Sequence, residues 1–335
     1  MKKNEVWTIS ELNQKQEIKP VSFELLARGR KLAQELEVPL SAVVLGNNLS
    51  EKELKELIYR GADKVYWVNH QALARFVVEN YSNIIKDLIE KYEPQIIIAA
   101  ATTQGRTLMP HLSIKLNTGL TADCTDLQIE KEMGLLLQIR PAIGGNIMAM
   151  IKTPERKPQM STVRPKSIQV LPRDETREGD IIPIDVADTL LDHRVIHLGY
   201  YQSEEEEVNL SSADMIVAGG RGIKKKENLG LIRDLAKQLD AAIGASREVV
   251  DRGWISYPHQ VGLSGKTVNP KTYLAIGISG AIQHLAGMKT AKTIIAINSD
   301  PQADIFKISD FGIIGDLFEI IPLLKKKLEE KKLSS

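Results

Sequence analysis

The chain has 335 residues, which is long for one ordinary domain and suits two domains of roughly 150 residues each. Hydrophobic residues make up 43% of the chain and charged residues 26%, a balance typical of globular proteins with full-sized cores. Because 44 Lys and Arg residues nearly balance 43 Asp and Glu residues, no global field favours nucleic acid as a partner. The single cysteine, Cys124, excludes a disulfide framework and a Cys-rich metal or iron–sulfur site within this chain.

No run of 18 apolar residues is present, so we expect no direct membrane insertion. The first residues lack the apolar core of a signal peptide and the composition of an organelle import signal. One cysteine also fits a reducing compartment. We therefore expect a cytoplasmic protein.

The first half of the chain alternates strand-like and helix-like segments, which predicts a parallel sheet with covering helices. We expect strands at residues 6–9, 40–45, 64–68 and 95–100, and helices at residues 20–36, 51–59 and 71–92. After about residue 118 the pattern changes to short alternating runs at residues 126–129, 135–139 and 146–151, with Gly or Pro between them. These runs predict an antiparallel extension, and residues 171–193 complete this first unit.

An acidic run, Glu204 to Glu207, is typical of a solvated linker and marks the expected boundary between domains 1–203 and 204–335. Beyond it the alternation resumes, with strands expected at residues 213–218, 273–278 and 293–297, a helix at 229–239 and a charged C-terminal helix from about 316. The sequence thus predicts an α/β protein with two Rossmann-like domains, the second of them doubly wound and flavodoxin-like.

Small-residue clusters follow two expected strands of the second domain, at residues 219–222 and 277–281. Such clusters let a backbone approach a phosphate closely, but they also form plain tight turns. Neither matches the Gly-x-Gly-x-x-Gly fingerprint or a P-loop, so the residues alone leave both interpretations open.

The order of the motifs is more specific. Residues 273–298 contain the run from Tyr273 through Ile278-Ser279-Gly280-Ala281-Ile282-Gln283-His284 to Asn298, preceded by the segments 246–254 and 260–268 and followed by 315–317. Together they resemble the electron transfer flavoprotein alpha subunit family. Segments 102–110, 118–124, 140–149 and 158–165 extend the resemblance over residues 6–324.

The resemblance implies an FAD in the C-terminal domain. Three residues would tune its redox behaviour: Arg247 as a cation beside the isoalloxazine ring, Ser264 as a hydroxyl donor to N5 where the family often has Thr, and His284 as a donor near the C2 carbonyl. The other implied contacts are Arg221, Ser246, Gln260, Val261, Gly262, Leu263, Ser279, Gly280, Ala281, Ile282, Gln283, Asn298, Asp316 and Leu317. Of these, residues 279–283 would surround the pyrophosphate, and the last three would hold the adenosine end. Asp316 could instead cap a helix. No metal site is expected.

The resemblance also implies partners. The N-terminal domain would support a separate beta subunit, although Thr102, Thr103, Gly105 and Arg106 could alternatively form an anion site. The ordinary family version takes electrons from an acyl-CoA dehydrogenase-type flavoprotein and passes them to another redox partner. The electron-bifurcating version has a second FAD in the beta subunit, where NADH is oxidised and electrons are divided between ferredoxin and a dehydrogenase. Both versions stay open at this point.

Two other functions compete with an electron carrier. An autonomous NAD- or FAD-dependent dehydrogenase would need a substrate pocket with a paired acid and base, and the sequence offers no such constellation. A nucleotide-binding scaffold without redox chemistry would need only the glycine-rich loops. The carrier interpretation predicts a subunit of an oxidoreductase complex rather than a stand-alone enzyme.

Overall fold

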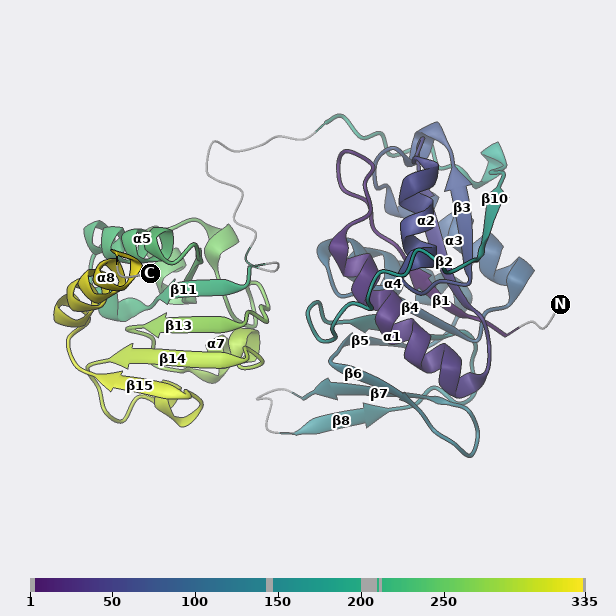
Figure 1. Cartoon of the computed structure of the whole chain (residues 1–335). Coiled ribbons are helices and arrows are strands. Elements are labelled where there is room, and N and C mark those ends of the chain that lie inside the picture. The colour runs from purple at the N-terminus through teal and green to yellow at the C-terminus, as the bar shows by residue number, and fades with distance from the viewer. Residues whose placement is uncertain (1–3, 143–146, 200–209, 211–212, 334–335) are drawn as a thin grey trace. The chain divides into compact units, whose positions relative to one another are not determined.

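The computed structural model describes residues 4–142, 147–199, 210 and 213–333. The chain forms two compact units, which we call the N-terminal unit (described residues up to 199) and the C-terminal unit (described residues from 210), as Figure 1 shows. The boundary expected between residues 203 and 204, with its acidic run, lies outside the described residues.

A seven-stranded parallel sheet forms the centre of the N-terminal unit, in the order β10-β3-β2-β1-β4-β9-β5. Its strands are β1 (Val6–Ile9), β2 (Leu40–Gly46), β3 (Lys64–Asn69), β4 (Ile96–Ala100), β5 (Leu120–Cys124), β9 (Gln159–Val163) and β10 (Asp180–Ile184). Helices α1 (Pro20–Leu36) and α2 (Glu51–Tyr59) cover one face, and α3 (Val78–Tyr92) and α4 (Thr103–Leu116) the other. Short 3-10 turns lie at Gln71–Leu73 and Asp188–Leu190.

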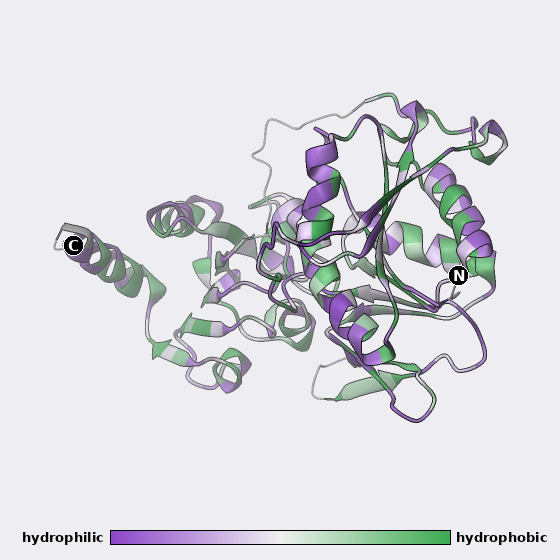
Figure 2. Ribbon diagram, turned by 45° about the vertical axis from the view of Figure 1, so that its right-hand side comes forward, coloured by the Kyte–Doolittle hydropathy of each residue, from purple (hydrophilic) through white to green (hydrophobic). Residues whose placement is uncertain are grey.

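Strand β4 explains why this sheet has two cores. Ile96 and Ile98 pack with α1 and α2, whereas Ile97 and Ala99 pack with α3 and α4. An uninterrupted apolar strand is what a parallel sheet covered on both faces requires. The helices carry hydrophobic residues beside hydrophilic ones (Figure 2).

The expected antiparallel extension is confirmed as a three-stranded sheet of β6 (Asp126–Ile129), β7 (Leu136–Pro141) and β8 (Met148–Ile151), with β7 in the middle.

A five-stranded parallel sheet forms the C-terminal unit, in the order β12-β11-β13-β14-β15. Its strands are β11 (Met215–Gly219), β12 (Ala242–Ala245), β13 (Thr272–Ile276), β14 (Thr293–Asn298) and β15 (Phe311–Ile314). Its helices are α5 (Leu229–Gln238), α6 (Arg247–Asp251), α7 (Ile282–Met288) and α8 (Leu317–Leu333), with 3-10 turns at Arg221–Ile223, Lys226–Asn228, Tyr257–His259 and Asp304–Lys307. This strand order is flavodoxin-like, and it reverses direction between β11 and β13. The predicted α/β class with two parallel sheets is confirmed.

Two expected elements were wrong in extent. The helix expected at 71–92 is a 3-10 turn followed by α3, because Val77 adopts an extended conformation with φ −124° and interrupts it. The strand expected at 273–278 ends at Ile276, because Gly277 takes φ +61° and turns the chain away from the sheet. Within the described part of the chain, no helix is both long and apolar enough to cross a bilayer.

Candidate functional site

The carboxyl edge of the C-terminal sheet gathers most of the candidate residues. They lie in the loops that follow β11, β12, β13 and β14, and short hydrogen bonds join these loops. The Ser246 amide donates to the Gly219 carbonyl at 3.0 Å, and the Gly220 amide donates to the Ile276 carbonyl at 2.8 Å. In a doubly wound sheet this edge, at the reversal of strand order, is where ligands bind.

The glycines of this edge pack the loops against one another. A Cβ atom on Gly220 would lie 2.3 Å from the Gly277 carbonyl oxygen, and one on Gly222 would lie 2.6 Å from the Gly277 Cα. No side chain fits at such distances, so these two glycines are required by contact between the β11 and β13 loops. Their role is therefore to hold the edge together.

The loop after β13 offers donors to an anion. In the described part of the chain, the backbone amides of Ser279, Gly280 and Ala281 have no hydrogen-bond acceptor. Gly280 has φ +89°, and a Cβ there would lie 2.2 Å from the Ile305 nitrogen, so the loop is fixed against the neighbouring 3-10 turn. Because Ser279 and Ala281 are exposed, a phosphate can reach this loop.

Two arginines lie at the same edge of the sheet, Arg221 after β11 and Arg247 after β12. The side chains of Arg221 and Arg247 are 72% and 70% exposed. Arg221 Nη1 lies 3.7 Å from Glu248 Oε2, and Arg247 Nε lies 3.1 Å from Asp251 Oδ2. Exposed pairs of this kind contribute little stability, so both guanidinium groups can turn towards a ligand at small cost.

The loop at residues 260–264 is held between β12 and α7. The Val261 amide donates to the Ala245 carbonyl at 2.9 Å, and the Leu263 amide donates to the Gln283 carbonyl at 2.7 Å. Buried Gln260 donates from Nε2 to the Ser264 hydroxyl oxygen at 3.0 Å. Since that oxygen accepts this bond, the hydroxyl proton of exposed Ser264 can be donated to a ligand.

His284 lies at the start of α7 and is buried. Its Nε2 atom is 3.0 Å from the hydroxyl of Tyr273, a core residue of β13. Burial lowers the pKa of His284 to about 4, although the backbone of Val261 opposes this shift, so the imidazole is neutral at pH 7. Its Nδ1 atom is buried and makes no hydrogen bond of normal geometry among the described residues, although the Val261 backbone lies close enough to interact with the ring. A buried nitrogen without a partner is the feature expected where a bound ligand supplies the missing group.

The candidates for the adenosine end have structural roles of their own. Asn298 donates from Nδ2 to the Ile278 carbonyl at 2.9 Å, which ties the β13 and β14 loops together. Asp316 Oδ1 accepts a hydrogen bond from the Phe318 amide at 2.9 Å, so Asp316 caps α8. The Leu317 side chain packs in the core at 6% exposure.

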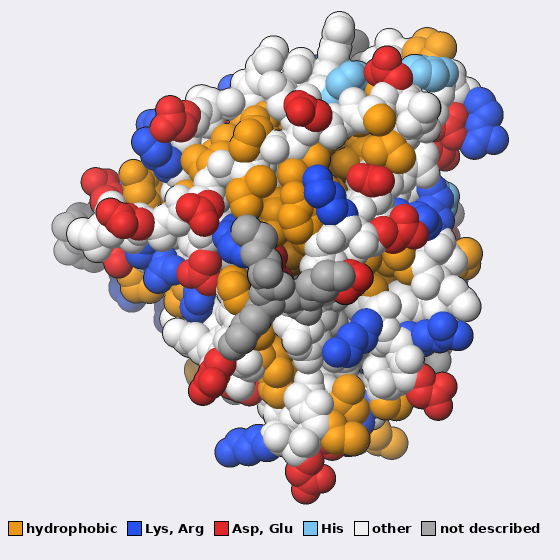
Figure 3. Space-filling view, turned by 90° about the vertical axis from the view of Figure 1, so that its right-hand side faces the viewer, with side chains coloured by type: hydrophobic (Ala, Val, Ile, Leu, Met, Phe, Trp, Pro, Cys, Tyr) orange, Lys and Arg blue, Asp and Glu red, His pale blue; other side chains and the backbone are white. Residues whose placement is uncertain are grey.

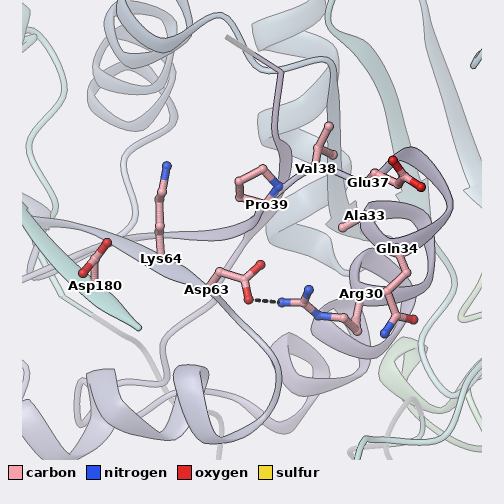
Figure 4. A pocket seen from close by; sticks show the side chains of 9 residues that line it. All are labelled: Arg30, Ala33, Gln34, Glu37, Val38, Pro39, Asp63, Lys64 and Asp180. Atoms are coloured by element: carbon pink, nitrogen blue, oxygen red, sulfur yellow. Dashed lines mark ion pairs between the residues drawn. The ribbon is translucent and has the colours of Figure 1, made fainter. Parts of the chain in front are cut away.

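The hollow of about 450 Å³ in Figure 4 lies elsewhere, in the N-terminal unit. It is lined by Arg30, Ala33, Gln34, Glu37, Val38, Pro39, Asp63, Lys64 and Asp180, none of them a candidate residue. Several of these residues precede or begin strands, which is the end opposite to the usual ligand edge. Asp63 already pairs with Arg30 at 2.6 Å and with Arg177 at 3.2 Å. We assign the functional site to the C-terminal sheet because its candidate residues lie at the carboxyl edge. No cluster that could hold a metal ion occurs in the described parts of the chain.

Three residues that contact the candidate side chains carry no clear signal in the sequence or were not singled out from it: Glu248, Asp251 and Tyr273. Asp251 and Glu248 hold the two exposed arginines, and the i, i+4 spacing of Arg247 and Asp251 on a helix could have indicated the first pair. Tyr273 gives no such signal, because its contact with His284 arises only when α7 packs on β13.

These features define a nucleotide- or flavin-binding domain of the doubly wound class. The comparisons with known proteins are more specific: residues 6–189 match the electron transfer flavoprotein domain, and residues 209–289 match the electron transfer flavoprotein FAD-binding domain. Over 98% of both chains, the sequence is 47% identical to the electron transfer flavoprotein subunit alpha of Thermoanaerobacterium thermosaccharolyticum. It is 43% identical to Protein FixB of Clostridium saccharobutylicum, over 97% of this chain and 96% of that one.

A third relative is the lactate dehydrogenase (NAD(+),ferredoxin) subunit LctC of Acetobacterium woodii, at 43% identity over 93% of this chain and 74% of that protein. The chain belongs to the electron transfer flavoprotein alpha subunit family, and its C-terminal unit is a flavin-binding domain. Alpha subunits of this family work with a beta subunit and with redox partners.

Proposed function

We propose that the chain holds one FAD at the carboxyl edge of its C-terminal sheet and carries electrons between an acyl-CoA dehydrogenase-type flavoprotein and another redox partner. The observation that carries this proposal is the meeting, at one edge, of unpartnered loop amides with two exposed arginines. A dinucleotide with a negatively charged pyrophosphate and an electron-accepting ring needs both kinds of group.

FAD, when bound, supplies the chemistry of one- and two-electron transfer. The chain would orient it and set its electrostatics. The amides of Ser279, Gly280 and Ala281 would hold the pyrophosphate, with Ile282 and Gln283 beside them. Arg247 would favour negative charge on the ring, and Ser264 would donate its free hydroxyl proton. His284 would donate from Nδ1, with no change of its own charge because it is already neutral.

The N-terminal unit would bind the beta subunit. Supporting this, Met148 and Met150 of edge strand β8 are 53% and 60% exposed, and neighbouring Ile147 is 70% exposed. Figure 3 shows a face of the N-terminal unit on which hydrophobic side chains gather between acidic and basic ones. Exposed apolar edges of this kind are usually covered by a partner. We place the complex in the cytoplasm.

The electron-bifurcating version is the second candidate. LctC, whose name includes NAD(+) and ferredoxin, is a relative that favours it. In this version a second FAD in the beta subunit would accept electrons from NADH and divide them between ferredoxin and the dehydrogenase.

One preparation tests the proposal and separates the versions. The chain is purified with its beta subunit, the flavin is released by denaturation, and its identity and amount per alpha–beta pair are measured by chromatography. One FAD supports the ordinary carrier, and two FAD with NADH-dependent ferredoxin reduction support the bifurcating version. A colourless complex that takes up no FAD would contradict both. Substrate oxidation by the chain alone would instead favour the autonomous dehydrogenase.

A further inference from the structure

Tyr273 stands behind His284, inside the C-terminal core. It lies within β13, next to the reversal of strand order, and is fully buried. Its hydroxyl is 3.0 Å from His284 Nε2, and the two rings meet edge-on with their centroids 6.1 Å apart. Tyr273 thus contacts the imidazole through the nitrogen opposite to the unpartnered Nδ1.

We propose that Tyr273 is a positioning residue, which donates its hydroxyl proton to His284 Nε2 and thereby makes Nδ1 the protonated nitrogen that faces the flavin. The inference rests on the proposed function, since it concerns how the chain prepares a donor for that ligand.

The argument is a count of hydrogen bonds. A neutral imidazole has one donor and one acceptor nitrogen, so the Tyr273–His284 bond can run in either direction. If Nε2 donated, the buried phenol proton would be left without an acceptor, and Nδ1 would be a buried acceptor without a donor. If the phenol donates, its proton is satisfied, and Nδ1–H can donate to a ligand or to the neighbouring Val261 backbone. An unsatisfied buried group costs roughly 1–3 kcal/mol, which favours the second arrangement.

The charge state of both groups permits this arrangement. Burial lowers the pKa of His284 and raises the pKa of Tyr273, so at pH 7 the imidazole is neutral and the phenol keeps its proton. No ionised partner is therefore needed to set the direction of the bond.

The surrounding backbone fixes the position of α7, and with it the position of the His284 ring relative to Tyr273. A Cβ on Gly287 would lie 2.4 Å from the Gly262 nitrogen, so α7 packs directly on the loop at residues 260–264. The Val268 amide donates to the Gly287 carbonyl at 2.8 Å on the same side. With α7 fixed to its neighbours, the Tyr273 hydroxyl orients the imidazole at Nε2, and the Val261 backbone interacts with the same ring.

The first test reads the tautomer directly. The alpha–beta complex is prepared free of flavin with 15N-labelled histidine, and the ring nitrogens of His284 are assigned by comparison with His284→Gln. We expect protonated Nδ1 and unprotonated Nε2. A protonated Nε2 in the unaltered protein would overturn the proposal, whether or not any Tyr273 variant folds. Because no flavin is present, this result is independent of the proposed function.

The second test is a double-mutant cycle. Tyr273→Phe keeps the ring and removes the hydroxyl, and it should lower the flavin potential by about 59 mV, the one-electron equivalent of a tenfold change. In the His284→Gln background the same substitution should have no further effect, because Tyr273 acts through His284. Tyr81→Phe removes another buried hydroxyl, bonded to the Leu45 carbonyl in the N-terminal unit, and should leave the potential unchanged. Equal effects of Tyr273→Phe in both backgrounds would refute the positioning role.

Discussion

The two parallel sheets of this chain have similar topology but opposite chemistry at their carboxyl edges. Both contain a reversal of strand order, between β1 and β4 in the N-terminal unit and between β11 and β13 in the C-terminal unit. At the first reversal, buried Glu11 accepts a hydrogen bond from the Thr102 hydroxyl and pairs with Lys19 at 3.2 Å. At the second, Arg221 and Arg247 are exposed, pair with the exposed carboxylates of Glu248 and Asp251, and share the edge with unpartnered amides.

This difference between the two edges shows that a reversal of strand order is not enough to make a ligand site. The side chains at the edge determine whether a ligand can bind there. Thr102 caps α4, which is where an anion would bind, and the carboxylate of Glu11 already lies against it. Gly105 is required by packing, since a Cβ there would lie 1.9 Å from the Ala100 carbonyl oxygen. Arg106 lies 3.5 Å from Asp123. The N-terminal edge is therefore satisfied by its own residues, which disfavours the anion site considered from the sequence.

The largest expected effect comes from separating the two loops of the C-terminal edge. In Gly220→Ala the new Cβ would lie 2.3 Å from the Gly277 carbonyl oxygen, so one loop must move. We expect the free energy of unfolding to fall by roughly 3 kcal/mol, the upper end for overpacking. Flavin should dissociate more than tenfold faster, which fluorescence of released flavin measures.

Gly230→Ala is the matched control, because no atom lies within 4 Å of its added Cβ and the site is an exposed position of α5. It should stabilise the protein by up to about 1 kcal/mol and leave the flavin in place. If both variants retained flavin equally, the contact between the two loops would not shape the site.

The second-largest effect is a loss of folding stability at low pH, and it follows from the buried neutral His284. In the unfolded chain this imidazole binds a proton near pH 6.5, whereas the folded protein resists protonation down to about pH 4. The folded state therefore has its full stability above pH 6.5 and loses up to roughly 3 kcal/mol as the pH falls to 4. Relative to His284→Gln, which has no such group, the unaltered protein should lose stability over this window in denaturant titrations. A constant difference between the two proteins from pH 7 to 4 would contradict the burial of a neutral ring.

Some elements could be predicted from the sequence because local pattern determines them. Helices at residues 20–36 and 51–59 have the predicted bounds, as does the strand at residues 6–9. Strand β10 was missed because it is a half-exposed edge strand containing Pro183, which local pattern does not favour. Helix α4 was missed because Pro110 lies inside it.

The sequence predicted which site residues follow strands, but not which of them contact one another. The β–α alternation placed residues 219–222 and 279–284 after strands, and the structure joins these loops at one edge. The contact of Tyr273 with His284 depends on how α7 packs, and the burial of Leu317 depends on the start of α8 against the sheet. Such contacts between elements leave no periodic pattern in the sequence.

A smaller effect tests the N-terminal edge. Glu11→Gln keeps an oxygen for the Thr102 hydroxyl but loses the charged bond to Lys19, which should cost roughly 1–2 kcal/mol of unfolding free energy. Flavin content should not change, because the substitution lies in the other unit. Glu17→Gln at an exposed position should shift stability by less than about 0.5 kcal/mol. A loss of flavin in Glu11→Gln would show that the edges are not independent.

The smallest effect on stability should come from Arg247→Ala. Its effect on the flavin tests the contrast between the carboxyl edges of the two sheets. The pair with Asp251 is exposed, so the free energy of unfolding should change by less than about 0.5 kcal/mol. The flavin potential should fall by about 59 mV for one electron, because a tenfold stabilisation of negative charge on the ring is lost. Arg252→Ala removes an arginine next to the same helix, one that pairs with Glu248 at 2.8 Å and lies over Trp254, and should leave the potential unchanged. The flavin potentials of both variants are measured by redox titration. Equal potentials in Arg247→Ala and Arg252→Ala would contradict a specific position of Arg247 beside the ring.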